Sequence, residues 1–73
     1  MVKKDKILVK LGSKIVEYRK LKNLSQEDLS FQVKSARNYI GCIERGEKSP
    51  SIKTLQKIAK ALNVELYLLL KFD

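Results

Sequence analysis

The feature that most constrains this chain is a pair of short helical patterns with only three residues between them. Ser25 is a natural N-cap for the first helix, and acidic residues follow it in the first turn, where the helix dipole favours them. This helix is expected to stop near Gln32, and the second spans residues 36–45. The connection, residues 33–35, has the length of a tight turn. The sequence therefore predicts two short helices joined by a tight turn.

The second of these helices has two unlike faces. Drawn at about 100° per residue, it turns Ile40, Ile43 and Glu44 to one side. The opposite side spans about 140°, has Tyr39 at its edge, and carries Arg37, Asn38, Gly41, Cys42 and Arg45. Arg and Asn can bond bidentately to guanine and adenine edges, and small residues let a helix lie close to a surface. Taken alone, such a face is more often an ordinary solvated helix surface than a DNA-reading one.

The pattern before these helices supplies part of a core. Residues 5–22 read as a helix that Asp5 can cap and Asn23 ends. Gly12 lies on its apolar stripe, where it permits close approach of another helix. Arg19 extends the same stripe and needs an acidic partner if it is buried. The stripe consists of Leu8, Leu11, Ile15 and Tyr18.

Two further helices are expected after the stretch at residues 36–45. Gly46 closes that stretch, and Ser51 caps a helix that Asn63 ends. Its apolar stripe is Ile52, Leu55, Ile58, Ala59 and Leu62. Residues 64–70, VELYLLL, form a last short helix that is too apolar to be left in water. The sequence contains no strand pattern, repeat or linker.

Composition narrows the class of protein. Sixteen Lys and Arg against eight Asp and Glu give a net charge of +8, which favours a polyanionic partner. The chain has no His, the commonest general base and metal ligand, and its single Cys cannot build a disulfide or a Cys-rich zinc site. No apolar run at the start suits a signal peptide or a membrane span. We expect a small soluble cytoplasmic protein that is not an enzyme and needs no metal, cofactor or small-molecule substrate.

In their order and spacing, four segments resemble the XRE family of Cro- and lambda-repressor-type helix-turn-helix proteins. They are LGSKIVEYRK, LSQEDLS, YIGCIERGEKSPS and IKTLQKIAKALNV. The resemblance implies an all-α, compact five-helix bundle of the lambda-repressor-like type, with residues 1–73 as one DNA-binding domain. It also implies binding to double-stranded operator DNA, usually as a symmetric dimer.

The resemblance assigns roles to particular residues. The family's buried ion pair falls on Arg19 and Glu44, and its phosphate-contacting Gln falls on Gln26. The base-reading positions fall on Arg37, Asn38, Gly41 and Cys42, with Tyr39 beside them.

This chain departs from the family pattern in the turn. The family usually has Gly, an apolar residue and then Ser or Thr where this chain has Lys34, Ser35 and Ala36. Lys34 is expected to adopt a left-handed conformation that Gly takes without strain. Ala36 cannot cap, so either Ser35 caps the helix one residue early or the helix start is frayed.

Several readings stay open within and beside this family. Arg37-Asn38-Tyr39-Ile40 followed by IERG is similar to restriction–modification controller proteins, which are small dimers without an effector domain. Phage-type repressors share the same frame, and so does an antitoxin-type module, whose last helix holds a toxin and which autoregulates. Binding to acidic membranes would need exposed apolar stripes, but neighbouring helices use these stripes here. We therefore expect no membrane partner.

The expected mechanism divides DNA binding among a few side chains. Gln26, Lys34 and Arg45 hold phosphates, which fixes the register without reading sequence. Arg37 and Asn38 read base edges in the major groove. Two copies pair through the last helix into a homodimer, and recognition helices one DNA turn apart, about 34 Å, require a palindromic operator. The residues expected in that dimer interface are Leu66, Leu69, Leu70 and Phe72.

Overall fold

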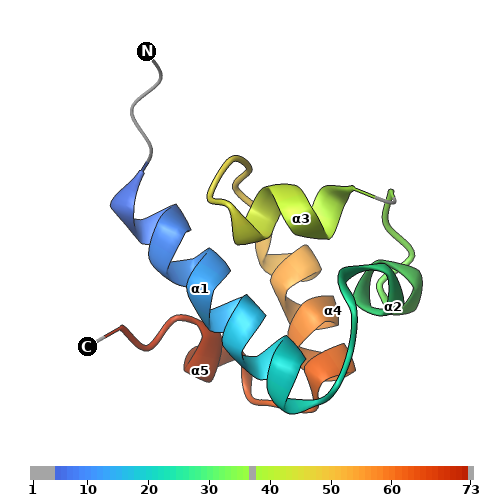
Figure 1. Ribbon diagram of the computed structural model, residues 1–73. Coiled ribbons are helices and arrows are strands. Elements are labelled where there is room, and N and C mark those ends of the chain that lie inside the picture. The colour runs from blue at the N-terminus through green and yellow to red at the C-terminus, as the bar shows by residue number, and fades with distance from the viewer. Residues whose placement is uncertain (1–4, 37, 73) are drawn as a thin grey trace.

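The computed structural model describes residues 5–36 and 38–72, and this part of the chain is built from α-helices alone (Figure 1). The helices are α1 (Lys6–Leu21), α2 (Gln26–Gln32), α3 (Tyr39–Glu44), α4 (Ile52–Leu62) and α5 (Leu66–Leu69). The predicted all-α bundle of five helices is confirmed. No helix of the described part is long and apolar enough to cross a membrane.

The helix ends follow the capping signals of the sequence. The side chain of Asp5 accepts hydrogen bonds from backbone N–H groups in the first turn of α1. Ser25 and Asp28 form a reciprocal capping box at the start of α2, and the hydroxyl of Ser51 accepts from the first turn of α4. Asn63 ends α4 in the left-handed conformation, with φ 57°. These predicted ends are therefore confirmed.

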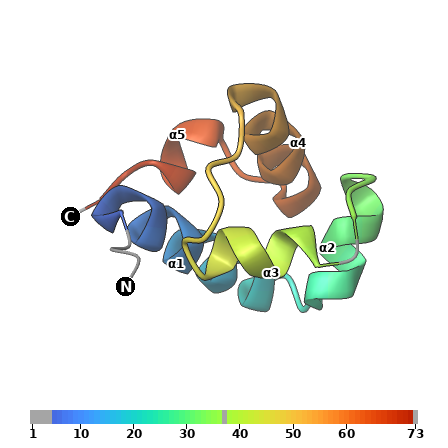
Figure 2. The same cartoon turned by 90° about the horizontal axis from the view of Figure 1, so that it is seen from above.

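The helices enclose a single cluster of apolar side chains. α3 packs against α1 and α2, while α4 packs against α2 and α5. Seen from above in Figure 2, α3 runs between α1 and α2, and α4 and α5 lie on the other side of the bundle. The largest fully buried side chains come from all five helices: Ile15, Leu29, Ile40, Ile43, Ile58, Leu62 and Leu69. The core thus fixes α3 at one edge of the molecule.

Among the glycines, Gly12 on α1 lies closest to the backbone of another helix, α3. A Cβ atom at Gly12 would lie 2.6 Å from the carbonyl oxygen of Ile43 and closer still to that of Glu44. No side chain fits there, because both neighbours are backbone atoms of α3. The predicted role of Gly12 in helix packing is confirmed.

The recognition helix is shorter than the sequence suggested. It begins at Tyr39 rather than near Ala36, and its N-cap residue Asn38 makes no side-chain capping hydrogen bond. Ser35 does not cap it either, because its hydroxyl donates to the carbonyl oxygen of Ala36 at 3.3 Å. Of the two alternatives for this helix start, the early Ser35 cap is wrong, and the later start without a capping side chain agrees with a frayed first turn. The last helix is also shorter than the expected 64–70.

Candidate nucleic-acid interface

Glu44 is the residue around which the polar face of α3 is organised. Its Oε2 accepts from Arg19 Nε at 2.6 Å, and its Oε1 accepts from Arg19 Nη2 at 3.2 Å. The two side chains are 11% and 4% exposed, so the pair is shielded from solvent. Arg19 Nη1 also donates to the carbonyl oxygen of Leu24 at 2.9 Å, just before α2 begins. The pair therefore fixes α3 relative to α1 and to the start of α2.

Gln26, the first residue of α2, is tied to the same carboxylate. Its Nε2 donates to Glu44 Oε1 at 2.8 Å, and its side chain is otherwise exposed. A primary amide has two N–H donors, so this hydrogen bond orients the group without using all of its donors. Gln26 is therefore held over the solvent side of α3 by a partner on α3 itself.

Gly41 does not lie open on this face, as its position on the helical wheel suggested. It is buried, and the side chains that cover it belong to Gln26 and Arg45. A Cβ atom at Gly41 would lie 3.1 Å from Arg45 Nη1 and 3.3 Å from Gln26 Oε1. The expectation that Gly41 is exposed on this face is corrected, because the Gln26 and Arg45 side chains lie over it.

Arg45 carries the outermost positive charge of this cluster. Its guanidinium is exposed and forms an ion pair with Glu47, with Nε 2.9 Å from Oε2 and Nη2 3.3 Å from Oε1. This hydrogen-bonded carboxylate raises the pKa of Arg45 above its usual range, so the group stays charged. Nη2 also lies 3.5 Å from Cys42 Sγ, which brings Cys42 into the same cluster. Glu47, which sequence reasoning did not select, could have been suggested by its place two residues after Arg45.

The remaining predicted positions differ in exposure. Asn38 is exposed, and Tyr39 is half-buried against the core. Lys34 is exposed and has a positive φ of 55°, so the predicted left-handed conformation is confirmed. Arg37, predicted to read bases, lies outside the described residues. The structure thus brings Gln26, Cys42 and Arg45 together around Gly41.

The surface expected to pair two copies needs a correction. Leu69 is 0% exposed and belongs to the core of one protomer, so its side chain is not available to a partner. Leu70 and Tyr67 are 41% and 63% exposed, and Leu66 and Phe72 pack partly against the core. The apolar surface that α5 leaves open therefore centres on Tyr67 and Leu70.

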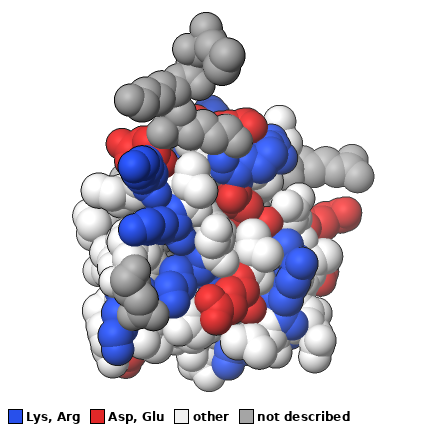
Figure 3. Space-filling view, turned by 60° about the vertical axis from the view of Figure 1, so that its left-hand side comes forward, with Lys and Arg blue, Asp and Glu red and all other residues white. Residues whose placement is uncertain are grey.

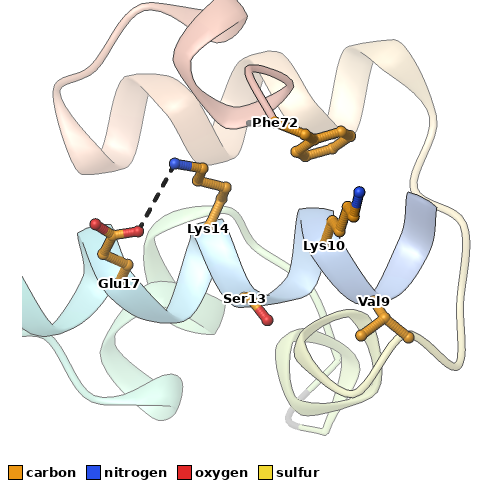
Figure 4. A pocket seen from close by; sticks show the side chains of 6 residues that line it. All are labelled: Val9, Lys10, Ser13, Lys14, Glu17 and Phe72. Carbon is orange, nitrogen blue, oxygen red and sulfur yellow. Dashed lines mark ion pairs between the residues drawn. The ribbon is translucent and has the colours of Figure 1, made fainter. Parts of the chain in front are cut away.

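A shallow groove lies along α1 beside the C-terminal segment (Figure 4). Lys10 and Lys14 point toward the same side as Phe72, and Lys14 Nζ lies 3.9 Å from Glu17 Oε2. Figure 3 shows that basic side chains form a column over one face of the molecule, with acidic side chains among them. The positive charge is therefore spread beyond α3, which suits a large anionic partner better than a small one.

Comparison with known proteins identifies the class. The helix-turn-helix family profile matches residues 15–69. Control protein C.BamHI of Bacillus amyloliquefaciens is 41% identical over 69 residues, which are 93% of this chain and 85% of that protein. This protein belongs to the helix-turn-helix family, of the XRE type that the sequence resembles.

Solved structures agree with this membership. The crystal structure of the restriction–modification controller protein C.AhdI from Aeromonas hydrophila matches with a TM-score of 0.82 and 42% identity, over 85% of this chain and 94% of that one. The biofilm regulator SinR, crystallised in complex with DNA, matches with a TM-score of 0.79 and 35% identity, over 84% of this chain and 98% of that one.

Proposed function

We propose that this protein is a sequence-specific DNA-binding transcriptional regulator that acts as a homodimer on a palindromic operator. The observation that carries the proposal is the polar cluster over α3, which a buried ion pair fixes to the rest of the bundle. The similarity to SinR, whose structure contains DNA, supports the same use of this fold. A net charge of +8 favours the phosphate backbone as partner.

The proposed division of labour follows the geometry of the cluster. Gln26, Lys34 and Arg45 contact phosphates, which sets the register of the protein on the duplex. Arg37 and Asn38 read base edges in the major groove, where Arg suits guanine and Asn suits adenine. Tyr39 and Cys42 border that contact. The buried Arg19–Glu44 pair stays outside it and holds α3 in place.

Within the regulators, the restriction–modification controller class is the best-supported assignment. C.BamHI and C.AhdI are both similar to this chain over most of their own length. These relatives also favour a regulator over an antitoxin-type module or an enzyme. We place the protein in the cytoplasm, where it meets DNA, and assign it no cofactor.

The proposed dimer uses the apolar surface that α5 leaves open. Tyr67 and Leu70 are exposed there, and aromatic and aliphatic side chains of this kind are typical of interface cores. One recognition helix of six residues contacts few base pairs, so two copies are needed to specify a site. A two-fold axis would place the two α3 helices about one DNA turn, roughly 34 Å, apart.

Duplex and membrane binding at matched salt test this function. We expect fluorescence anisotropy to show binding to a labelled duplex that weakens by orders of magnitude between about 50 and 200 mM salt. Arg45→Ala should make the salt dependence shallower by about one counterion per protomer. Lys57→Ala is the matched control. It also removes an exposed positive charge, but Lys57 lies on α4, outside the polar cluster over α3. Salt-independent duplex binding, or preferential binding to anionic vesicles, would contradict the proposal.

A further inference from the structure

We infer that Gly41 is a positioning residue: because it has no side chain, the Gln26 amide and the Arg45 guanidinium can both pack against its backbone. The inference rests on the proposed function and gives Gly41 a role other than contact with DNA. It follows from the difference between the outward position of Gly41 on the helix and its burial in the folded chain.

Two side chains from different helices cover Gly41. Gln26 comes from the start of α2 and Arg45 directly follows α3, and the polar ends of both lie within 3.3 Å of the position that a Cβ atom of residue 41 would take. Each has its own acidic anchor, since Gln26 donates to Glu44 at 2.8 Å and Arg45 pairs with Glu47 at 2.9 Å. The anchors fix where each group is held, and Gly41 leaves the room in which both fit.

The variant Gly41→Ala should move these two polar groups without disturbing the fold. Its Cβ atom would lie 3.1 Å from Arg45 Nη1 and 3.3 Å from Gln26 Oε1, so both ends must move by a few tenths of an ångström. They are the far ends of flexible side chains on an exposed face, so the bundle can adjust without repacking its core. Alanine also favours the helix interior more than glycine does. The fold should therefore tolerate Gly41→Ala.

DNA binding should not tolerate the change equally well. Hydrogen bonds from an amide and a guanidinium are directional, and such groups act best when held within about 0.5 Å of their working position. A shift of a few tenths of an ångström takes up most of that margin, and a dimer presents the cluster twice, so we expect Gly41→Ala to weaken duplex binding by about threefold to tenfold. The loss should appear on every duplex sequence alike, because the displaced groups are assigned to phosphates.

The test compares Gly41→Ala in two backgrounds: the wild-type protein and a protein carrying Gln26→Ala and Arg45→Ala. Thermal unfolding and duplex anisotropy are measured for all four proteins, at low salt so that weak binding stays measurable. We expect an unchanged or higher melting temperature for Gly41→Ala, weaker binding in the wild-type background, and no further weakening where Gln26 and Arg45 are already absent.

Three results would overturn the inference: Gly41→Ala binding like the wild type, a loss of binding that tracks a lower melting temperature, or the same loss in both backgrounds. A wild-type protein that binds no duplex would instead remove the proposed function, and this inference with it. The two failures are therefore distinguishable from the wild-type titration alone.

Discussion

Arg19 and Glu44, on helices α1 and α3, meet in a two-point ion pair whose shortest N–O distance is 2.6 Å. Glu44 Oε1 also accepts from Gln26 on α2, so one carboxylate joins the first three helices. The pair links the stability of the bundle to the placement of the recognition helix. A change at Glu44 should therefore affect folding and DNA binding together.

Replacing Glu44 by Ala should leave Arg19 buried without its carboxylate partner. Loss of one member of a buried pair typically costs about 3–5 kcal/mol, which is a large part of the stability of a chain this small. Urea unfolding measures the cost, and Glu17→Ala is the control because Glu17 is 60% exposed and lies 3.9 Å from its partner Lys14. A loss below about 1 kcal/mol for Glu44→Ala would mean that the ion pair is not shielded in solution.

Gly12→Ala should push α1 away from α3. The added Cβ atom would collide with backbone carbonyl groups of Ile43 and Glu44, which cannot turn aside as a side chain can. We expect a destabilisation of about 1–3 kcal/mol or more, measured by urea unfolding. Ser13→Ala places the same residue at the next, exposed position of α1 and should cause no loss. Equal stability of the two variants would contradict the close approach of the helices.

Lys34→Gly should raise stability and lower affinity for DNA. Lys34 has φ 55°, a conformation that costs an L-residue about 1–2 kcal/mol and that glycine adopts without strain. The greater freedom of glycine in the unfolded chain cancels part of this gain. We expect a net gain of about 0.5–1 kcal/mol in urea unfolding. Binding to all duplexes should weaken with the loss of the positive charge.

Asn23→Gly is the control for Lys34→Gly. Asn23 has the similar φ of 57°, but Asn tolerates this conformation and the residue lies in the turn after α1. Its substitution should give a smaller gain in stability and no change in DNA binding. If Lys34→Gly bound DNA as well as the wild type does, Lys34 would not be a phosphate contact.

The parts of the fold that sequence predicted are those with local causes. Asp5, Ser25 and Ser51 bond to backbone groups in the turn that directly follows them, so their effect is visible in a few neighbouring letters. The helical pattern of apolar residues predicts that α3 starts at Ala36, but the helix begins at Tyr39 because no side chain caps an earlier start. A helical period alone does not show where the first turn unwinds.

The errors at Leu69 and Gly41 have causes distant in the sequence. A helix of four residues has no apolar stripe long enough to show which side meets the core, so the burial of Leu69 follows only from how α5 packs. Gly41 is covered in part by Gln26, which comes from another helix. The helical wheel of α3 cannot include that side chain.

Leu70→Glu tests the proposed dimer surface. Leu70 is exposed in the protomer, so a carboxylate there should leave the fold intact and disfavour pairing of two copies. Analytical ultracentrifugation should show a monomer. Circular dichroism should show unchanged helical content, and duplex anisotropy should show weaker operator binding. Lys71→Glu, the same charge at the next exposed position, is the control. A Leu70→Glu protein that still sediments as a dimer would place the interface elsewhere.

Selection of bound duplexes from a random pool, followed by sequencing, tests the central claim most directly. The wild-type protein should enrich a palindrome whose half-sites lie about 10 base pairs apart, as two recognition helices on one face of the duplex require. Arg37→Ala should enrich a motif with relaxed preference at one position in each half-site, because each base contact contributes about 1–3 kcal/mol of discrimination. Enrichment of no motif, or of one without two-fold symmetry, would contradict a dimeric sequence-specific regulator.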